Sequence, residues 1–183
     1  TTKNYVEFID AGYFLTIIWR TMLIAVEVTV LCALLGYPLA YLIARGPKSW
    51  RVPLILLVIF PMLLNLVVRS FGWIALLANR GLINNLLIQL GLTTAPVKML
   101  FNFVGLFIGL THIYLPFMVL MLVAAIRNVP RDVESAAATL GSSRLHVFTS
   151  VTLPLSAPGI LAGSILVFVL TISALVTPRT KST

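Results

Sequence analysis

Charged residues are scarce in this sequence of 183 amino acids, where they make up 10% of the chain while apolar residues make up 60%. A soluble domain carries roughly 25% charged residues, so this chain has too few to cover a surface that faces water. The mean hydropathy of +1.06 agrees with that conclusion. We therefore expect one all-α integral membrane domain over residues 1–183, because helices satisfy their own backbone hydrogen bonds in lipid.

Acidic residues, histidine and cysteine are also rare, with five, two and one copies. The single cysteine, Cys32, excludes an intrachain disulfide, and His112 and His146 are far apart in the sequence, so we expect no metal, no cofactor and no catalytic residue. The net charge of +8 does not indicate a nucleic-acid partner. The basic residues stand singly at the ends of apolar runs, where such residues set membrane topology and reach the lipid headgroups.

Four apolar runs approach or exceed the ~20 residues that a helix needs to cross the hydrocarbon core of a bilayer. They are Thr21–Ala44, Val52–Val68, Leu100–Ile126 and Leu153–Pro178. The short connection Arg45–Arg51 holds three basic residues and no acid, which predicts a cytoplasmic turn by the positive-inside rule. Alternation of sides then places the loop 127–152 in the cytoplasm as well.

A further helix is predicted between the second and third runs. In the segment Leu82–Leu90, leucine and isoleucine recur at helical spacing, and Asn84, Asn85 and Gln89 take the other side. This pattern predicts an amphipathic helix that lies in the membrane interface.

The loop 127–152 carries the signals of a short helix from Pro130 to Leu140. Proline suits a first helical turn, Asp132 and Glu134 lie near the positive end of the helix dipole, and Gly141 can adopt the left-handed conformation that ends a helix. One apolar stripe runs along this helix and consists of Val133, Ala136, Ala137 and Leu140. Because so short a helix is marginal in water by itself, we expect the stripe to dock on a partner.

The same loop resembles that of the membrane subunits of ABC importers with binding-protein-dependent uptake, whose pattern is E-A-A-x-x-x-G, nine residues, I-x-L-P. The matching positions in this chain are Ala136, Ala137, Gly141, Val151, Leu153 and Pro154. The family's glutamate position is Ser135, and an acid, Glu134, stands one residue earlier. The segments Arg69–Trp73, Gly81–Asn84 and Leu115–Met118 are similar to the spermidine/putrescine branch of that family.

This resemblance implies the type I importer permease fold, with four transmembrane helices present, a cytoplasmic coupling helix and an interfacial helix. Such a subunit has six helices, so the first and last would be missing and we expect a fragment, with Arg179–Thr183 in place of the last helix. The chain would form the translocation pathway for a small solute, here a polyamine such as spermidine or putrescine, in the bacterial inner membrane. Relatives in this family carry other small solutes, among them iron, opines and phosphonates.

The resemblance also implies partners, namely a dimer of ATP-binding subunits, a second permease subunit, an extracytoplasmic solute-binding protein and the lipid bilayer. The residues that couple to the ATP-binding subunit would be Glu134, Ser135, Ala136, Ala137, Gly141, Val151, Leu153 and Pro154. ATP hydrolysis would belong to the partner, because the chain contains no G-x-x-x-x-G-K-[ST] loop.

Polar residues inside the apolar runs are candidates for the solute pathway, because ionisable groups in a span are functional hypotheses by default. They are Glu27, Asn65, His112 and Tyr114. Glu27 is either a counter-charge for a cationic solute or the partner of a nearby polar side chain. His112 and Asn65 either contact solute or form hydrogen bonds between helices.

Two other functions remain open at this point. An ATP-independent channel or secondary transporter would explain the apolar runs, but it would not need a docking helix in the loop. An intramembrane serine enzyme could use Ser164 and His112, although Ser164 lacks the second glycine of a G-x-S-x-G context.

Overall fold

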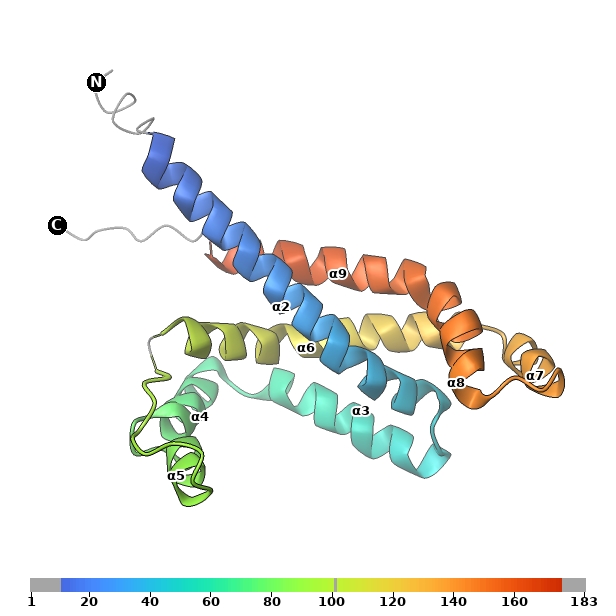
Figure 1. Cartoon of the computed structure of the whole chain (residues 1–183), viewed down its shortest axis with the longest axis horizontal. Coiled ribbons are helices and arrows are strands. Elements are labelled where there is room, and N and C mark those ends of the chain that lie inside the picture. The colour runs from blue at the N-terminus through green and yellow to red at the C-terminus, as the bar shows by residue number, and fades with distance from the viewer. Residues whose placement is uncertain (1–10, 101, 176–183) are drawn as a thin grey trace.

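The computed structural model describes residues 11–100 and 102–175, and its regular elements are all helical (Figure 1). The elements are α2 (Ala11–Arg45), α3 (Lys48–Leu63), α4 (Leu66–Leu77), α5 (Leu82–Gln89), α6 (Phe103–Asn128), α7 (Arg131–Thr139), α8 (Arg144–Val147), the π-helical turn η1 (Phe148–Thr152) and α9 (Leu153–Leu175). Within these residues the all-α prediction is confirmed.

Helices α2, α6 and α9 pack against one another and form the core (Figure 1). The central side chains come from all three helices, with Met118 and Leu122 of α6 fully buried in one cluster with Val28 and Cys32 of α2 and Val167 of α9. Cys32 is thus a small packing residue.

Glycines on α9 let that helix approach α6 closely. A Cβ atom added at Gly159 would overlap the Cβ of Ala125, and one added at Gly163 would lie 2.8 Å from the sulfur of Met118. Small residues have this role between membrane helices, where backbone proximity replaces the hydrophobic effect as a source of packing energy.

Within residues 11–100 and 102–175, four stretches are long and apolar enough to cross a membrane, as judged by length and composition. They are Leu15–Arg45, Val67–Gln89, Phe103–Asn128 and Arg144–Leu175. The predicted runs Thr21–Ala44, Leu100–Ile126 and Leu153–Pro178 overlap the first, third and fourth of these, and Pro178 lies outside the described residues. The stretch Val67–Gln89 includes the turn between α4 and α5.

The predicted second run, Val52–Val68, is corrected, because it is not one helix. α3 ends at Leu63, Leu64 is extended, and α4 begins at Leu66 after the cap residue Asn65, whose side chain accepts a hydrogen bond from the Val67 N–H at 2.9 Å. At ~1.5 Å per residue, α3 is about 24 Å long, which is shorter than the ~30 Å hydrocarbon core.

Arg69 explains how the chain can break at this point. Its Nη2 donates to the carbonyls of Pro61 at 2.7 Å and Leu64 at 3.1 Å, which satisfies backbone groups that the end of α3 leaves open. A hydropathy pattern does not register this break, since the residues around Asn65 remain apolar.

The predicted helix after Arg80 is present as α5. Of its three polar residues Asn84 faces the protein, whereas Asn85 and Gln89 are exposed. Asn84 is fully buried, its Nδ2 donates to the carbonyls of Ala78 and Val97 at 3.0 Å each, and its Oδ1 accepts from the Val97 N–H at 2.9 Å. Leu82 and Leu86 are exposed instead. The helix is confirmed, and its location in the membrane interface stays a prediction.

The connection between α2 and α3 lies at the same end of the molecule as α7 and α8, whereas α4 and α5 lie at the opposite end (Figure 1). The two segments that the sequence places in the cytoplasm therefore share one end of the helical body.

Candidate functional site

The loop helix has the position and the ends that the sequence predicts. α7 spans Arg131–Thr139, with Pro130 as the residue before it and Leu140 as the residue after it. Gly141 has a φ of +86°, its N–H donates to the Ala138 carbonyl at 3.0 Å, and the Ser142 N–H donates to the Ala137 carbonyl at 3.3 Å. This pair of bonds is a Schellman motif, which stops the helix and turns the chain toward α8.

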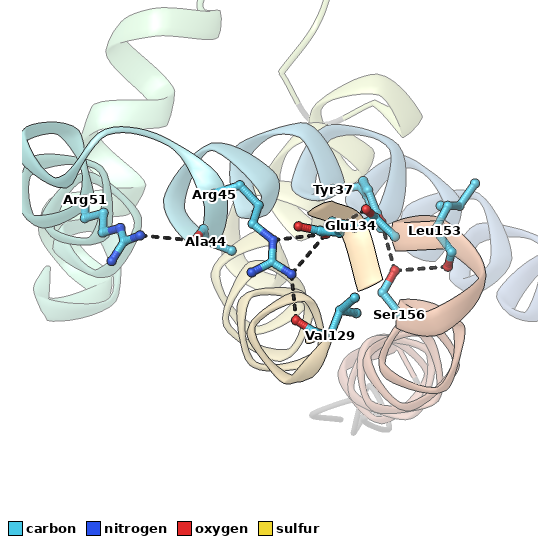
Figure 2. Close-up of polar contacts among 9 residues, drawn as sticks. Tyr37, Ala44, Arg45, Arg51, Val129, Glu134, Leu153 and Ser156 are labelled. Atoms are coloured by element: carbon cyan, nitrogen blue, oxygen red, sulfur yellow. Dashed lines mark hydrogen bonds and ion pairs between the residues drawn. The ribbon is translucent and has the colours of Figure 1, made fainter. Parts of the chain in front are cut away.

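Four residues fasten α7 to the helical body, and we call them the loop anchor: Arg45, Val129, Glu134 and Thr152. The Oε1 of Glu134 lies 3.0 Å from the Nη2 of Arg45 and accepts from the Arg45 Nε at 3.2 Å and from the Thr152 hydroxyl at 2.8 Å. The Nη2 of Arg45 also donates to the Val129 carbonyl at 2.8 Å, as Figure 2 shows.

The loop anchor joins the last residue of α2, the end of α6, the middle of α7 and the end of η1. The side chains of Arg45 and Glu134 are only 10% and 18% exposed, so solvent screens their attraction less than it screens an ion pair on an open surface. Charge-assisted hydrogen bonds of this kind are shorter and stronger than neutral ones. These contacts connect α7 directly to the end of α2 and to η1.

An aromatic cluster lies beside the anchor and ties α2 to the start of α9. The hydroxyls of Tyr37 and Ser156 are 2.8 Å apart (Figure 2). The rings of Tyr37 and Tyr41 both meet Phe148 of η1 edge-on, at centroid distances of 5.7 Å and 5.2 Å. Edge-on contact is a favoured geometry for aromatic pairs. Phe148 of η1 thus contacts two residues on successive turns of α2.

The predicted apolar stripe of α7 is not covered by the described part of the chain. Val133 is 44% exposed and Leu140 is 86% exposed, Ala136 is exposed and Ala137 is half-buried. α7 is thus anchored through Glu134 while its apolar side chains stay accessible at the end of the molecule.

The other residues of the loop pattern differ in how far their side chains are exposed. Ser135, which stands at the family's glutamate position, is exposed, whereas Glu134 is turned into the anchor. Val151 is half-buried in η1, and Leu153 and Pro154 are exposed in the first turn of α9.

The structure does not bring the four predicted pathway residues together. Glu27 is exposed on α2, Asn65 caps α4, and the Tyr114 hydroxyl donates to the Leu170 carbonyl at 3.0 Å, which links α6 to α9. His112 lines a cavity of about 190 Å³ together with Arg69, and its ring meets Trp73 edge-on at 5.1 Å.

The residues of the serine-enzyme alternative are also separate. Ser164 lines a groove between α2 and α9, and His112 lines the different cavity beside Pro61 and Pro116. Ser164 and His112 therefore do not form the serine–histidine pair that this alternative needs.

Sequence reasoning predicted Glu134 but missed the other three members of the loop anchor, one of which, Val129, takes part only through its backbone carbonyl. Arg45 is interpreted from the sequence as a topology residue, and Thr152 appears only as the end of the loop. The available signal is the balance of charge. An acid of α7 that packs against the helical body needs a cation, and Arg45 follows directly after the first apolar run.

Comparison with known proteins agrees with this geometry. Residues 36–180 match the family described as the binding-protein-dependent transport system inner membrane component. The chain belongs to this family. It is therefore a multi-pass inner-membrane permease component with the type I importer fold that the loop pattern implies.

The chain is also similar to several individual permease proteins. The chain is 35% identical over 167 residues to the spermidine/putrescine transport system permease protein PotB of Escherichia coli (strain K12), which covers 91% of this chain and 60% of PotB. It is 34% identical over 175 residues to the inner membrane ABC transporter permease protein YdcU of the same organism, covering 89% of this chain and 56% of YdcU. It is 36% identical over 140 residues to the molybdenum transport system permease protein ModB of Mycobacterium bovis, covering 76% of this chain and 51% of ModB.

The chain thus spans about 60% of the length of the PotB relatives that it matches. The family match over residues 36–180 includes the end of α2, all of α6 and α9, the loop anchor and α7.

Proposed function

We propose that this chain forms part of the translocation pathway of an ABC importer and that α7 docks on a separate ATP-binding subunit. The observation that carries the proposal is that Glu134 holds α7 to the helical body while the side chains of Val133, Ala136 and Leu140 stay exposed. An anchored helix with an accessible apolar stripe suits an insertion into a partner groove, because burial of the stripe supplies the binding energy.

The mechanism follows from the anchor. When ATP binding closes the partner subunits, the force on α7 passes through Glu134 to Arg45 and Thr152, and so to α2 and α9. The helical core then rocks between inward-facing and outward-facing states. In this mechanism the chain itself hydrolyses nothing, and a solute-binding protein and a second permease subunit complete the importer.

The proposed solute is a polyamine, spermidine or putrescine. The support is the similarity to the PotB proteins over 91% of the chain. The molybdenum permease ModB shows that proteins similar to this chain are named for other solutes, so the solute needs a direct test.

Site-specific crosslinking tests the docking. Cys32 is the only cysteine and is buried, so a Cys32→Ser background makes Leu140→Cys a single accessible probe on the stripe. We expect Leu140→Cys to crosslink to the ATP-binding subunit and a control, Asn79→Cys, in the exposed turn at the opposite end, to give no such product. Equal labelling of both positions, or none at Leu140, would contradict the docking.

Uptake by the assembled importer tests the solute. We expect labelled spermidine or putrescine to accumulate in an ATP-dependent manner and molybdate to leave that uptake unchanged. Uptake that persists when the ATP-binding subunit is inactivated would instead favour an ATP-independent transporter.

A further inference from the structure

An open groove of about 500 Å³ lies at the same end of the molecule as α7, beside the loop anchor. One wall comes from the end of α2 and the turn that follows, and the other comes from α8 and η1. The side chains that matter are Tyr41, Leu42, Arg45, Arg144, Leu145 and Phe148.

The walls of this groove are cationic. Arg45 and Arg144 face it from opposite sides, and Lys48 and Arg51 follow in the first turn of α3. The segments 41–51 and 140–151 contain no acidic residue. Glu134 contacts one of these cations, Arg45, and its carboxylate is already used by Arg45 and Thr152.

The groove also has an apolar part. Leu42 is 52% exposed and Leu145 is 73% exposed. The rings of Tyr41 and Phe148 meet edge-on, with their centroids 5.2 Å apart. Leucine side chains left open next to arginines form a mixed surface that suits a ligand with an anionic head and an apolar chain.

The groove lies between the ends of two stretches that are apolar enough to cross a membrane. The apolar stretch Leu15–Arg45 ends at Arg45, and the stretch Arg144–Leu175 begins at Arg144. Two arginines at the ends of adjacent membrane helices mark the boundary between hydrocarbon and water, which is the layer that the lipid phosphates occupy.

We propose that this groove binds the phosphate headgroup of an anionic phospholipid of the inner leaflet, with Arg144 as the main ligand to the phosphate. Arg45 lines the same groove while it holds Glu134, and Leu42 and Leu145 contact the first part of the acyl chain. The assignment to the inner leaflet rests on the proposed orientation, in which α7 is cytoplasmic. A lipid bound here lies against Arg45, so it stabilises the end of α2 at the point where the loop anchor forms.

The test uses the assembled importer in nanodiscs that contain equal amounts of phosphatidylglycerol and phosphatidylcholine, with native mass spectrometry of the lipids that remain bound. We expect retained phosphatidylglycerol to exceed phosphatidylcholine, and Arg144→Gln to lower that preference about fivefold, the factor that one basic side chain near an anionic surface contributes. Arg144→Lys should keep most of the preference, because a point charge still binds a phosphate.

Arg80→Gln is the matched control, since Arg80 is exposed at the opposite end of the molecule and the substitution removes the same charge. An equal loss in Arg80→Gln and Arg144→Gln would overturn the site and indicate general attraction to the surface. Crosslinking of Leu145→Cys, in the Cys32→Ser background, to the ATP-binding subunit without any phosphatidylglycerol preference would also overturn it, because the partner would then fill the groove. The docking of α7 is read out separately at Leu140, so the two proposals can fail independently.

Discussion

Arg45 and Glu134 are 89 positions apart in the sequence, yet the Arg45 guanidinium lies 3.0 Å from the Glu134 carboxylate. The same carboxylate oxygen accepts the Thr152 hydroxyl, so one atom joins α2, α7 and η1. Glu134 stands one residue before the family's glutamate position, and the structure uses it within its own chain. The side chain of Ser135, at the family's glutamate position, is exposed on α7 together with most of the apolar stripe.

Removal of the Glu134 charge should loosen the loop helix without unfolding the core. A hydrogen bond to a charged group contributes about 1.5–3 kcal/mol, and we expect a double-mutant cycle of Arg45→Gln and Glu134→Gln to give a coupling free energy in that range. In the assembled importer, Glu134→Gln should lower uptake while ATP hydrolysis continues. Asp132→Asn is the control, because Asp132 is an exposed acid in the same helical turn. Equal effects of the two substitutions would contradict the anchor role.

Gly141 should not tolerate a side chain, although there is space for one. An added Cβ would meet nothing within 4 Å, so the cost comes only from the φ of +86°, and a left-handed residue other than glycine costs about 1–2 kcal/mol. We expect Gly141→Ala to fray the end of α7, seen as faster amide hydrogen exchange at Leu140–Ser142, and Gly141→Asn to be milder. Gly72→Ala, in helix α4 with equally open surroundings, should be neutral or stabilising.

Bulk on the apolar stripe should interfere with docking. We expect Ala136→Trp to reduce co-purification of the ATP-binding subunit, because an indole does not fit where an alanine contacts a partner closely. Ala138→Trp adds the same bulk to an exposed position outside the stripe and should be tolerated better. Unchanged co-purification and uptake in Ala136→Trp would remove the stripe as the docking surface.

Two adjacent asparagines in α5 should differ sharply in their contribution to stability. Asn84 is fully buried and makes three hydrogen bonds, whereas Asn85 is exposed and donates once, at 3.4 Å, to the Arg80 carbonyl. Leaving a buried backbone group unpaired costs about 1–3 kcal/mol, so Asn84→Ala should lower the free energy of unfolding by at least that amount. Asn85→Ala should change it by less than about 0.5 kcal/mol. Thermal unfolding in detergent would measure both, and a similar effect of the two would count against the buried network around Val97.

Local features of the chain were sufficient to predict much of this protein. The scarcity of charge and the long apolar runs predict membrane helices, and Pro130, the acids that follow and Gly141 predict α7 to within one residue at each end. These features act between neighbours along the chain, through hydrogen bonds within a helix, capping and the helix dipole, so they can be recognised without a fold.

The tertiary structure alone decided the rest. Arg45 meets Glu134 only because α2 and α6 end at the same side of the core, and Arg69 ends α3 by folding back onto the carbonyls of Pro61 and Leu64. The sequence pattern predicts Asn84 on a polar, solvent-facing side of its helix. The residue is buried instead, because the backbone of Val97 lies against it and forms two hydrogen bonds with its side chain. The physical reason is the same in each case: the free energy of a polar side chain depends on which distant backbone or charge lies against it, and helix packing determines that neighbour.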